Sequence, residues 1–207
     1  MKINRPGQQG LLLLTLWCAA VMAADNAPGL VLVDSLDHRY VEIPATYHPK
    51  RFNRAAGLKN HHFLTWEKGG AAGRALFTTP VPDSAIHDAL VNLGAVPGNN
   101  LTNETWAQRD NKNHPAPDLL VEGARVALEI YVKNSSPFPI DHFLSDHGGR
   151  GFDFRFGGNR ALIPIWKSGC VVCLQSCPGS KIGNHSYMHE QWLHQYSPGE
   201  IHSELER

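Results

Sequence analysis

The chain has 207 residues, with 19 Lys and Arg balanced by 19 Asp and Glu, so its formal charge is zero. A neutral chain has no strong positive field for nucleic acid or for an anionic membrane surface, and we expect neither as a partner. The length is sufficient for one domain with a substantial core, which need not depend on disulfides or metal to fold.

The first 23 residues have the pattern of a secretory signal peptide. Lys2 and Arg5 form a basic start, an apolar run follows at 11–21, and Ala23 suits the position before the cleavage site. The run is too short to favour a membrane-spanning helix, so no stable membrane span is expected after cleavage. Cleavage would leave 17 basic and 19 acidic residues, a formal charge of −2. We therefore predict an exported, periplasmic protein in which residues 24–207 form a single domain.

Strands are predicted first along the body of the chain. Gly29–Asp34 and Tyr40–Ile43 are short apolar or alternating runs that predict a hairpin. His62–Trp66 and Arg74–Thr78 predict two further strands, joined by a Gly-rich turn at 69–73.

The clearest helix is predicted at about 82–93, where five apolar residues recur at helical spacing on one face. These residues are Ala85, Ile86, Ala89, Leu90 and Leu93. Pro82 suits the first turn of this helix and Gly94 suits its end. His87 falls on the polar face, so we expect it to be solvated.

The second half of the chain predicts more strands and a long loop at 95–120. Arg125–Lys133 alternates strictly and predicts a half-buried antiparallel strand. Phe152–Phe156 predicts a strand with an aromatic core face, and Ala161–Trp166 predicts a last strand, placed at an edge by Pro164. Strands therefore outnumber helices, and the predicted class is α+β with a mainly antiparallel sheet.

The chemistry is expected in the segment Gly169–Asn184, which contains every cysteine outside the leader. Cys170, Cys173 and Cys177, followed by Pro178, give the spacing C-x2-C-x3-C-P. Three thiols so close in sequence are typical of a metal ion, an iron–sulfur cluster or a redox disulfide.

Two kinds of cofactor suit these cysteines. The spacing matches the last three positions of the bacterial ferredoxin run, with Lys167 where the first cysteine would stand, which indicates an iron–sulfur cluster. Soft thiolates joined by a histidine from the His-rich tail 185–207 would instead bind copper or zinc. His185 and His189 are the candidate fourth ligands, because they would share one face of a helix.

Two alternatives need no cofactor. The Cys170 and Cys173 pair follows a predicted strand, as in a thiol–disulfide redox protein, and a structural disulfide could instead brace an extracytoplasmic interaction module. His61 and His62 head another strand, and regular alternation predicts that at most one of them faces a given site.

Several segments together resemble the YdjY-like domain, a family of small exported bacterial proteins of uncharacterised function. The resemblance runs through His62–Glu67, Ala75–Leu90, Leu93–Gly98 and Val126–Val132. It covers roughly residues 30–165 and is most specific in the strand-to-helix unit that ends in Leu-Gly-Ala-Val-Pro-Gly. Members are sometimes described as ferredoxin-like on the strength of cysteines, which the resemblance carries onto Cys170, Cys173 and Cys177.

These observations together predict an exported α+β protein that binds a metal ion or an iron–sulfur cluster through Cys170, Cys173 and Cys177. We expect electron transfer or metal handling, with a redox or metal-handling protein as partner. A carrier or accessory subunit is expected rather than an enzyme, since no hydrolase motif and no phosphate-binding loop is present in the sequence.

Overall fold

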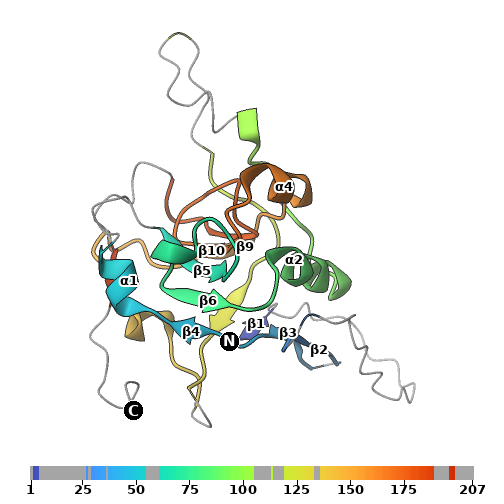
Figure 1. Cartoon of the computed structure of the whole chain (residues 1–207). Coiled ribbons are helices and arrows are strands. Elements are labelled where there is room, and N and C mark those ends of the chain that lie inside the picture. Colours follow the sequence, from blue (N-terminus) through green and yellow to red (C-terminus); the bar gives the residue numbers. More distant parts are fainter. Residues whose placement is uncertain are drawn as a thin grey trace.

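The computed structural model describes residues 2–4, 27, 29–35, 37–54, 61–104, 113, 119–132, 136–188 and 196–198 of the chain. Strands dominate this part and helices are few, so the protein is α+β, as its sequence predicts (Figure 1). No helix among the described residues has the length and apolar character needed to cross a bilayer.

A six-stranded sheet forms the centre of the fold. Its strands, in spatial order, are β4 (Thr46–Tyr47), β6 (Phe77–Thr79), β5 (His62–Trp66), β10 (Cys170–Cys173), β11 (Ile182–Asn184) and β9 (Phe154–Phe156). β5 pairs parallel with β6, and β10 pairs parallel with β11, while the other neighbours are antiparallel. The cysteine-bearing strand β10 therefore lies inside the sheet, between β5 and β11.

A second sheet is antiparallel throughout. Its strands, in spatial order, are β2 (Val31–Asp34), β3 (Arg39–Glu42), β1 (Lys2–Asn4) and β7 (Ala127–Glu129). β2 and β3 form the predicted hairpin. β1 belongs to the predicted leader, whose residues 5–23 lie outside the described part of the chain. A separate two-stranded ribbon pairs β8 (Leu144–Asp146) with β12 (Tyr196–Pro198).

The helices are short. They are α1 (Pro49–Arg54), α2 (Asp83–Asn92) and α4 (Ile163–Trp166), with 3-10 turns η2 (Ala72–Arg74), η3 (Ile140–His142) and η4 (Arg160–Leu162). α2 agrees with the helix predicted at 82–93, and it packs against β3 of one sheet and β10 of the other. The main core includes side chains from both sheets and from α2, among them Val41, Leu64, Ile86 and Phe156.

The position of α2 makes one prediction wrong. His87, expected to be solvated, is only 6% exposed. Its ring centroid lies 5.2 Å from that of Phe156, and its Nδ1 lies 2.9 Å from the Asp88 carboxylate. Because α2 contacts both sheets, more of its circumference is covered than the apolar stripe of a surface helix would suggest.

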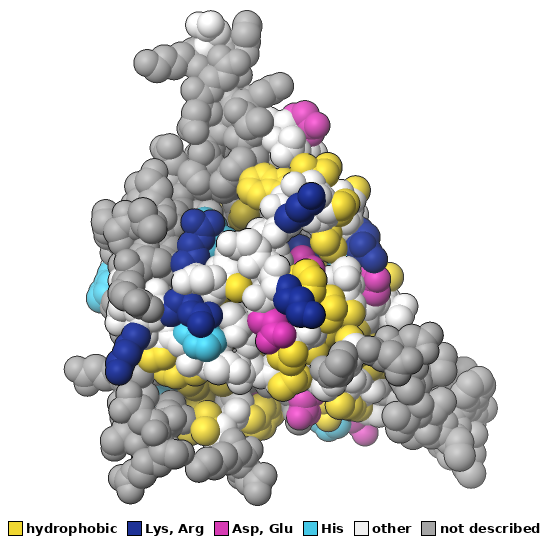
Figure 2. Space-filling view, in the orientation of Figure 1, with side chains coloured by type: hydrophobic (Ala, Val, Ile, Leu, Met, Phe, Trp, Pro, Cys, Tyr) yellow, Lys and Arg dark blue, Asp and Glu magenta, His cyan; other side chains and the backbone are white. Residues whose placement is uncertain are grey.

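The predicted strand at Ala161–Trp166 is also wrong, because this segment forms η4 and α4. Asn159 has a φ of 51° and turns the chain into these helical turns, and Lys167 ends them with a φ of 50°. Pro164 lies in the first turn of α4, where its missing N–H leaves no helical hydrogen bond unmade. Hydrophobic side chains gather at the surface over α4, where Ile165 is 61% exposed (Figure 2).

Other strands differ from prediction in length or pairing. Arg74 belongs to η2, so β6 begins only at Phe77, and it pairs parallel with β5. Of the alternating run at 125–133, only β7 forms a regular strand. Val126 and Ile130, on the predicted apolar face of the run, are buried. The ends of the long loop are tied by the Asn100 side chain, which donates to the Leu120 carbonyl (2.8 Å) and accepts from the Glu122 N–H (3.0 Å).

Candidate metal centre

Irregular pairing of β10 with β5 brings two of the cysteines to one side of the sheet. Cys170 and Cys173 begin and end β10, and residues three positions apart on a regular strand would point to opposite faces. Cys170 pairs with Thr65 and Cys173 pairs with His62, with two shifts of register between them. Such bulges re-aim side chains, and here both thiols join one cluster.

All three cysteines are buried together, apart from the main core. Cys170, Cys173 and Cys177 are 1%, 0% and 5% exposed, and the partly buried Trp166 packs against them. The whole segment 169–184 is buried, so it is an interior element of the fold. The three cysteines form no disulfide in this structure.

Three glycines allow this close packing. Gly169 has a φ of 68°, and a Cβ there would lie 2.6 Å from the Cα of Gly69. The loop after β5 therefore runs directly against the start of β10, and Gly69 could not carry a side chain either, since its Cβ would lie 2.4 Å from the Ser168 carbonyl oxygen. Gly179 lies under the Trp166 indole, and a Cβ there would approach a ring carbon to 2.8 Å.

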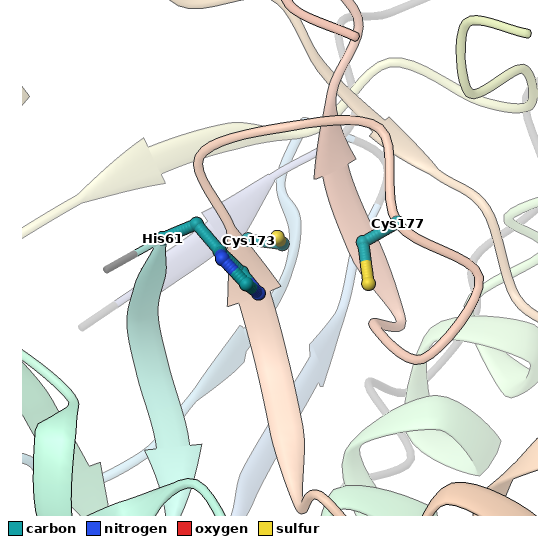
Figure 3. Close-up of side chains that lie close together, drawn as sticks. All are labelled: His61, Cys173 and Cys177. Atoms are coloured by element: carbon teal, nitrogen blue, oxygen red, sulfur yellow. The ribbon is translucent and has the colours of Figure 1, made fainter. Parts of the chain in front are cut away.

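Two histidines complete the cluster. The ligand atoms of His61, Cys173 and Cys177 all lie within 4.8 Å of one another. Figure 3 shows these three side chains beside the end of β10 and the loop that follows it. His62 Nδ1 lies 3.3 Å from Cys170 Sγ, and the two imidazole centroids are 4.1 Å apart.

The prediction that at most one of these histidines faces a given site is therefore wrong. His61 stands before the first residue of β5, so the alternation of that strand does not fix its direction. His62 lies opposite Cys173 in the ladder, yet its ring reaches Cys170 because the register is shifted between them. The sequence signal was the adjacent His-His pair; the information that links it to the cysteines lies in the pairing of β5 with β10.

The thiols differ in their affinity for protons. Burial raises the pKa of Cys173 well above its ordinary value, and hydrogen bonds with Cys170 and Cys177 raise it further. The pKa of Cys177 is lowered, chiefly by the hydrogen bond with Cys173, although burial opposes this. Cys177 is therefore the thiol of this pair that ionises first, with Cys173 as its donor.

The turn after Cys177 adds positive potential at its sulfur. Backbone N–H groups of Gly179 and Ser180 and the charge of Lys181 contribute, after the Cys173 hydrogen bond, to lowering the Cys177 pKa. The turn is fixed by the Ser180 hydroxyl, which donates to the Cys177 carbonyl at 2.8 Å. N–H groups directed at a thiolate are the arrangement that stabilises metal-bound sulfur.

The second imidazole is held neutral. Burial lowers the pKa of His62 well below its ordinary value, and the nearby His61 and Arg74 lower it further. A neutral ring can accept a hydrogen bond or bind a metal ion, whereas a protonated ring can do neither.

Of the two histidines predicted as fourth ligands, the structure describes only His185, and it is not in this group. His185 Nδ1 lies 2.6 Å from the Val121 carbonyl oxygen. His189 lies outside the described residues. Within the described part of the chain, the donor set that the fold brings together is three thiols with His61 and His62.

Comparison with known proteins gives two matches. The family model for the YdjY domain matches residues 31–197, a span that contains the whole six-stranded sheet and all three clustered cysteines. The uncharacterised protein YdjY of Escherichia coli K12 is 29% identical over 127 residues, which are 61% of this chain and 52% of that relative. The chain thus aligns with about half of the relative's length. No solved structure matches.

Proposed function

This chain belongs to the YdjY domain family, and we propose that it binds a soft transition-metal ion through Cys170, Cys173 and Cys177, with His61 as fourth ligand, for electron transfer or metal handling outside the cytoplasm. The observation that carries the proposal is the group of donor atoms of His61, Cys173 and Cys177, all within 4.8 Å of one another. In a tetrahedral site with metal–sulfur bonds of about 2.3 Å, neighbouring ligands are about 3.8 Å apart. Three of the four proposed ligands therefore lie within about 1 Å of the spacing that one coordination sphere requires.

The donor types favour zinc or cuprous copper. Thiolate and imidazole ligands suit both ions, and Cys3His is a known closed set for zinc. An iron–sulfur cluster remains the alternative, but its ligands must surround a core of several iron and sulfide atoms. The sulfurs of Cys173 and Cys177 lie within 4.8 Å of each other and of a His61 ring nitrogen, and donor atoms so close together favour a single ion.

His62 supports the proposed ligands through its contact with Cys170. Its Nδ1 lies 3.3 Å from Cys170 Sγ, and its ring is buried. A group in that position orients a sulfur and modifies its basicity without itself needing to bind the ion.

The setting suits a carrier or an accessory subunit. The predicted leader would export the chain, and the partly buried Trp166 and His61 lie against the buried cysteines. A redox or metal-handling protein is the proposed partner, and the proposal requires no catalytic group.

The test is elemental analysis of the protein purified from its exported compartment, read beside its visible spectrum and a count of free thiols. Zinc or copper bound one to one, with three protected thiols, is expected. Iron with sulfide would favour the cluster instead. Absence of metal with a single free thiol would overturn the proposal in favour of a structural disulfide, and loss of thiol-exchange activity in Cys170→Ser would identify a thiol–disulfide redox protein.

The ligand set is tested in the same assay by two matched histidine variants. His61→Gln should lower affinity for zinc by about tenfold or more, as loss of a ligand or of its support does. His185→Gln serves as the control and should leave the affinity unchanged, because its imidazole is engaged with Val121. If instead His185→Gln lowers the affinity and His61→Gln does not, the fourth ligand is the tail histidine His185.

A further inference from the structure

Thr65 has a buried hydroxyl group that the proposed function does not use. This residue of β5 is 0% exposed, and its Oγ1 makes no hydrogen bond within the described part of the chain. A buried hydroxyl without a partner destabilises a fold, and most such groups in native proteins have one. The place of Thr65 in the sheet indicates which group its partner is.

Thr65 lies directly opposite Cys170 in the ladder between β5 and β10. The Trp66 N–H donates to the Gly169 carbonyl oxygen at 2.8 Å, one residue beyond this pair on each strand. A bond at that position makes Thr65 and Cys170 a non-hydrogen-bonded antiparallel pair, whose side chains share one face and approach each other most closely. The register of β10 shifts only after Cys170, so the pair precedes the bulge. The hydroxyl is therefore a neighbour of the Cys170 thiol.

The metal-free thiol is a poor partner for this hydroxyl. Cys170 Sγ donates its own hydrogen to the Val172 carbonyl oxygen at 3.6 Å, and a thiol sulfur is a weak acceptor. A cysteine binds a metal ion as the thiolate, after its proton has been released to solvent. An ionised sulfur accepts strongly, and a threonine hydroxyl can turn its hydrogen toward it. Loading would thus supply the acceptor that Thr65 lacks.

We infer that Thr65 is a positioning residue of the proposed metal centre, whose hydroxyl donates a hydrogen bond to the Cys170 thiolate when an ion is bound. This inference rests on the proposed function. It adds a second contact to the Cys170 sulfur, besides that of His62, and one that forms only in the loaded state. A hydrogen bond of this kind orients the ligand and stabilises its charge in a buried site.

Thr65→Val tests the two states separately, because valine matches threonine in shape but has no hydroxyl. The affinity for Zn²⁺ or Cu⁺, measured by chelator competition, should fall about tenfold, as it does on loss of a group that supports a ligand. The metal-free variant should unfold at the same or a higher urea concentration than the unaltered protein, because no unpaired hydroxyl remains. Thr65→Ser keeps the hydroxyl and should retain most of the affinity.

Thr79→Val is the matched control. Thr79 is equally buried, on the neighbouring strand β6, but its Oγ1 accepts the Val81 N–H at 3.2 Å. Removal of this acceptor leaves a buried N–H unpaired, so Thr79→Val should unfold at a lower urea concentration. It should bind the metal ion as tightly as the unaltered protein does. The same substitution at the two threonines is thus expected to have opposite effects on stability and on affinity.

Co²⁺ in place of zinc reports the hydrogen bond directly. The energy of thiolate-to-cobalt absorption depends on the electron density of the sulfur, which a hydrogen bond lowers. In Thr65→Val this band should move to longer wavelength. In Thr65→Ser and Thr79→Val it should stay in place.

The results separate this inference from the proposed function. An unaltered protein that binds no Zn²⁺, Co²⁺ or Cu⁺ contradicts the proposed function. If it binds metal, and Thr65→Val binds equally tightly with an unmoved cobalt band, the inference alone is overturned. Destabilisation of metal-free Thr65→Val would show that the hydroxyl has a partner before loading, and it would overturn the inference as well.

Discussion

Gly179 illustrates how closely single residues are fitted around the cysteines. The Trp166 ring occupies the space in which a side chain at 179 would stand, with Cε3 at 2.8 Å and Cδ2 at 3.1 Å from a Cβ there. These are rigid aromatic atoms, and the indole itself packs against the three thiols. Any side chain at this position must therefore move Trp166, the turn after Cys177, or both.

Gly179→Ala is expected to destabilise the fold by about 1–3 kcal/mol, the usual cost of overpacking a well-filled interior. Urea unfolding monitored by tryptophan fluorescence measures it. Gly73→Ala is the matched control, because a Cβ at 73 would meet nothing within 4 Å. Equal stability of the two variants would show that the indole moves freely.

At the scale of elements, the pairing of β5 with β10 determines which side chains lie beside the cysteines. The spacing of the cysteines in the sequence does not. The sequence identified the three cysteines, the hairpin of β2 with β3, strand β5 and helix α2 from local patterns, and the structure confirms these elements. It did not identify His61 and His62 as neighbours of the thiols, because their placement depends on register shifts between segments about a hundred residues apart in sequence. The alternation of residues along a strand predicts the face on which a side chain lies only where the strand is regular.

α4 and His87 were missed for related reasons. The apolar run ending at Trp166 is too short for its period to distinguish a helical turn from a strand, and Pro164 is compatible with both. The solvated face predicted for His87 assumed a helix with one buried side, whereas α2 lies against two sheets.

The burial of α2 predicts a dependence of stability on pH. Burial lowers the pKa of His87, in spite of the opposing Asp88 carboxylate. Below about pH 6.5 the unfolded chain protonates this histidine while the folded chain keeps it neutral. The contribution of His87 to the free energy of unfolding is therefore fully present above that pH. It is lost as the pH falls toward the lower folded-state pKa.

His87→Gln should make the fall in unfolding free energy between about pH 6.5 and pH 5 shallower, as measured by denaturant titrations across that range. A residual slope is expected, because burial also lowers the pKa of His48 and of His62. Exposed His38→Gln is the control for removing a histidine. A steeper slope in His87→Gln than in the unaltered protein would contradict the assignment.

In the whole molecule, the described part of the predicted leader and the proposed metal centre belong to different sheets. β1 lies between β3 and β7 in the four-stranded sheet, whereas the cysteines lie in the six-stranded one. Loss of β1 would separate β3 from β7 without touching a strand next to β10. Processing of the chain and integrity of the cluster are therefore separable.

Export from a bacterial host should yield a protein that begins at Ala24 and still protects its three thiols from modification. N-terminal sequencing and intact mass identify the first residue, and a thiol count under native conditions reports the cluster. The same count on denatured protein is the control. An exported protein that retains Lys2 would show that the leader is not cleaved.

The continuous burial of residues 169–184 has a consequence for the lifetime of a bound ion. An ion enclosed on most sides leaves only when part of the fold opens, so its release would proceed at the rate of that opening and would not accelerate with more chelator. Rapid delivery of the ion to a recipient demands an open ligand shell, whereas electrons can cross a closed one. A closed centre of the proposed kind would therefore favour retention of its ion over rapid delivery, and it would allow electron transfer with copper but not with zinc, which has no redox chemistry.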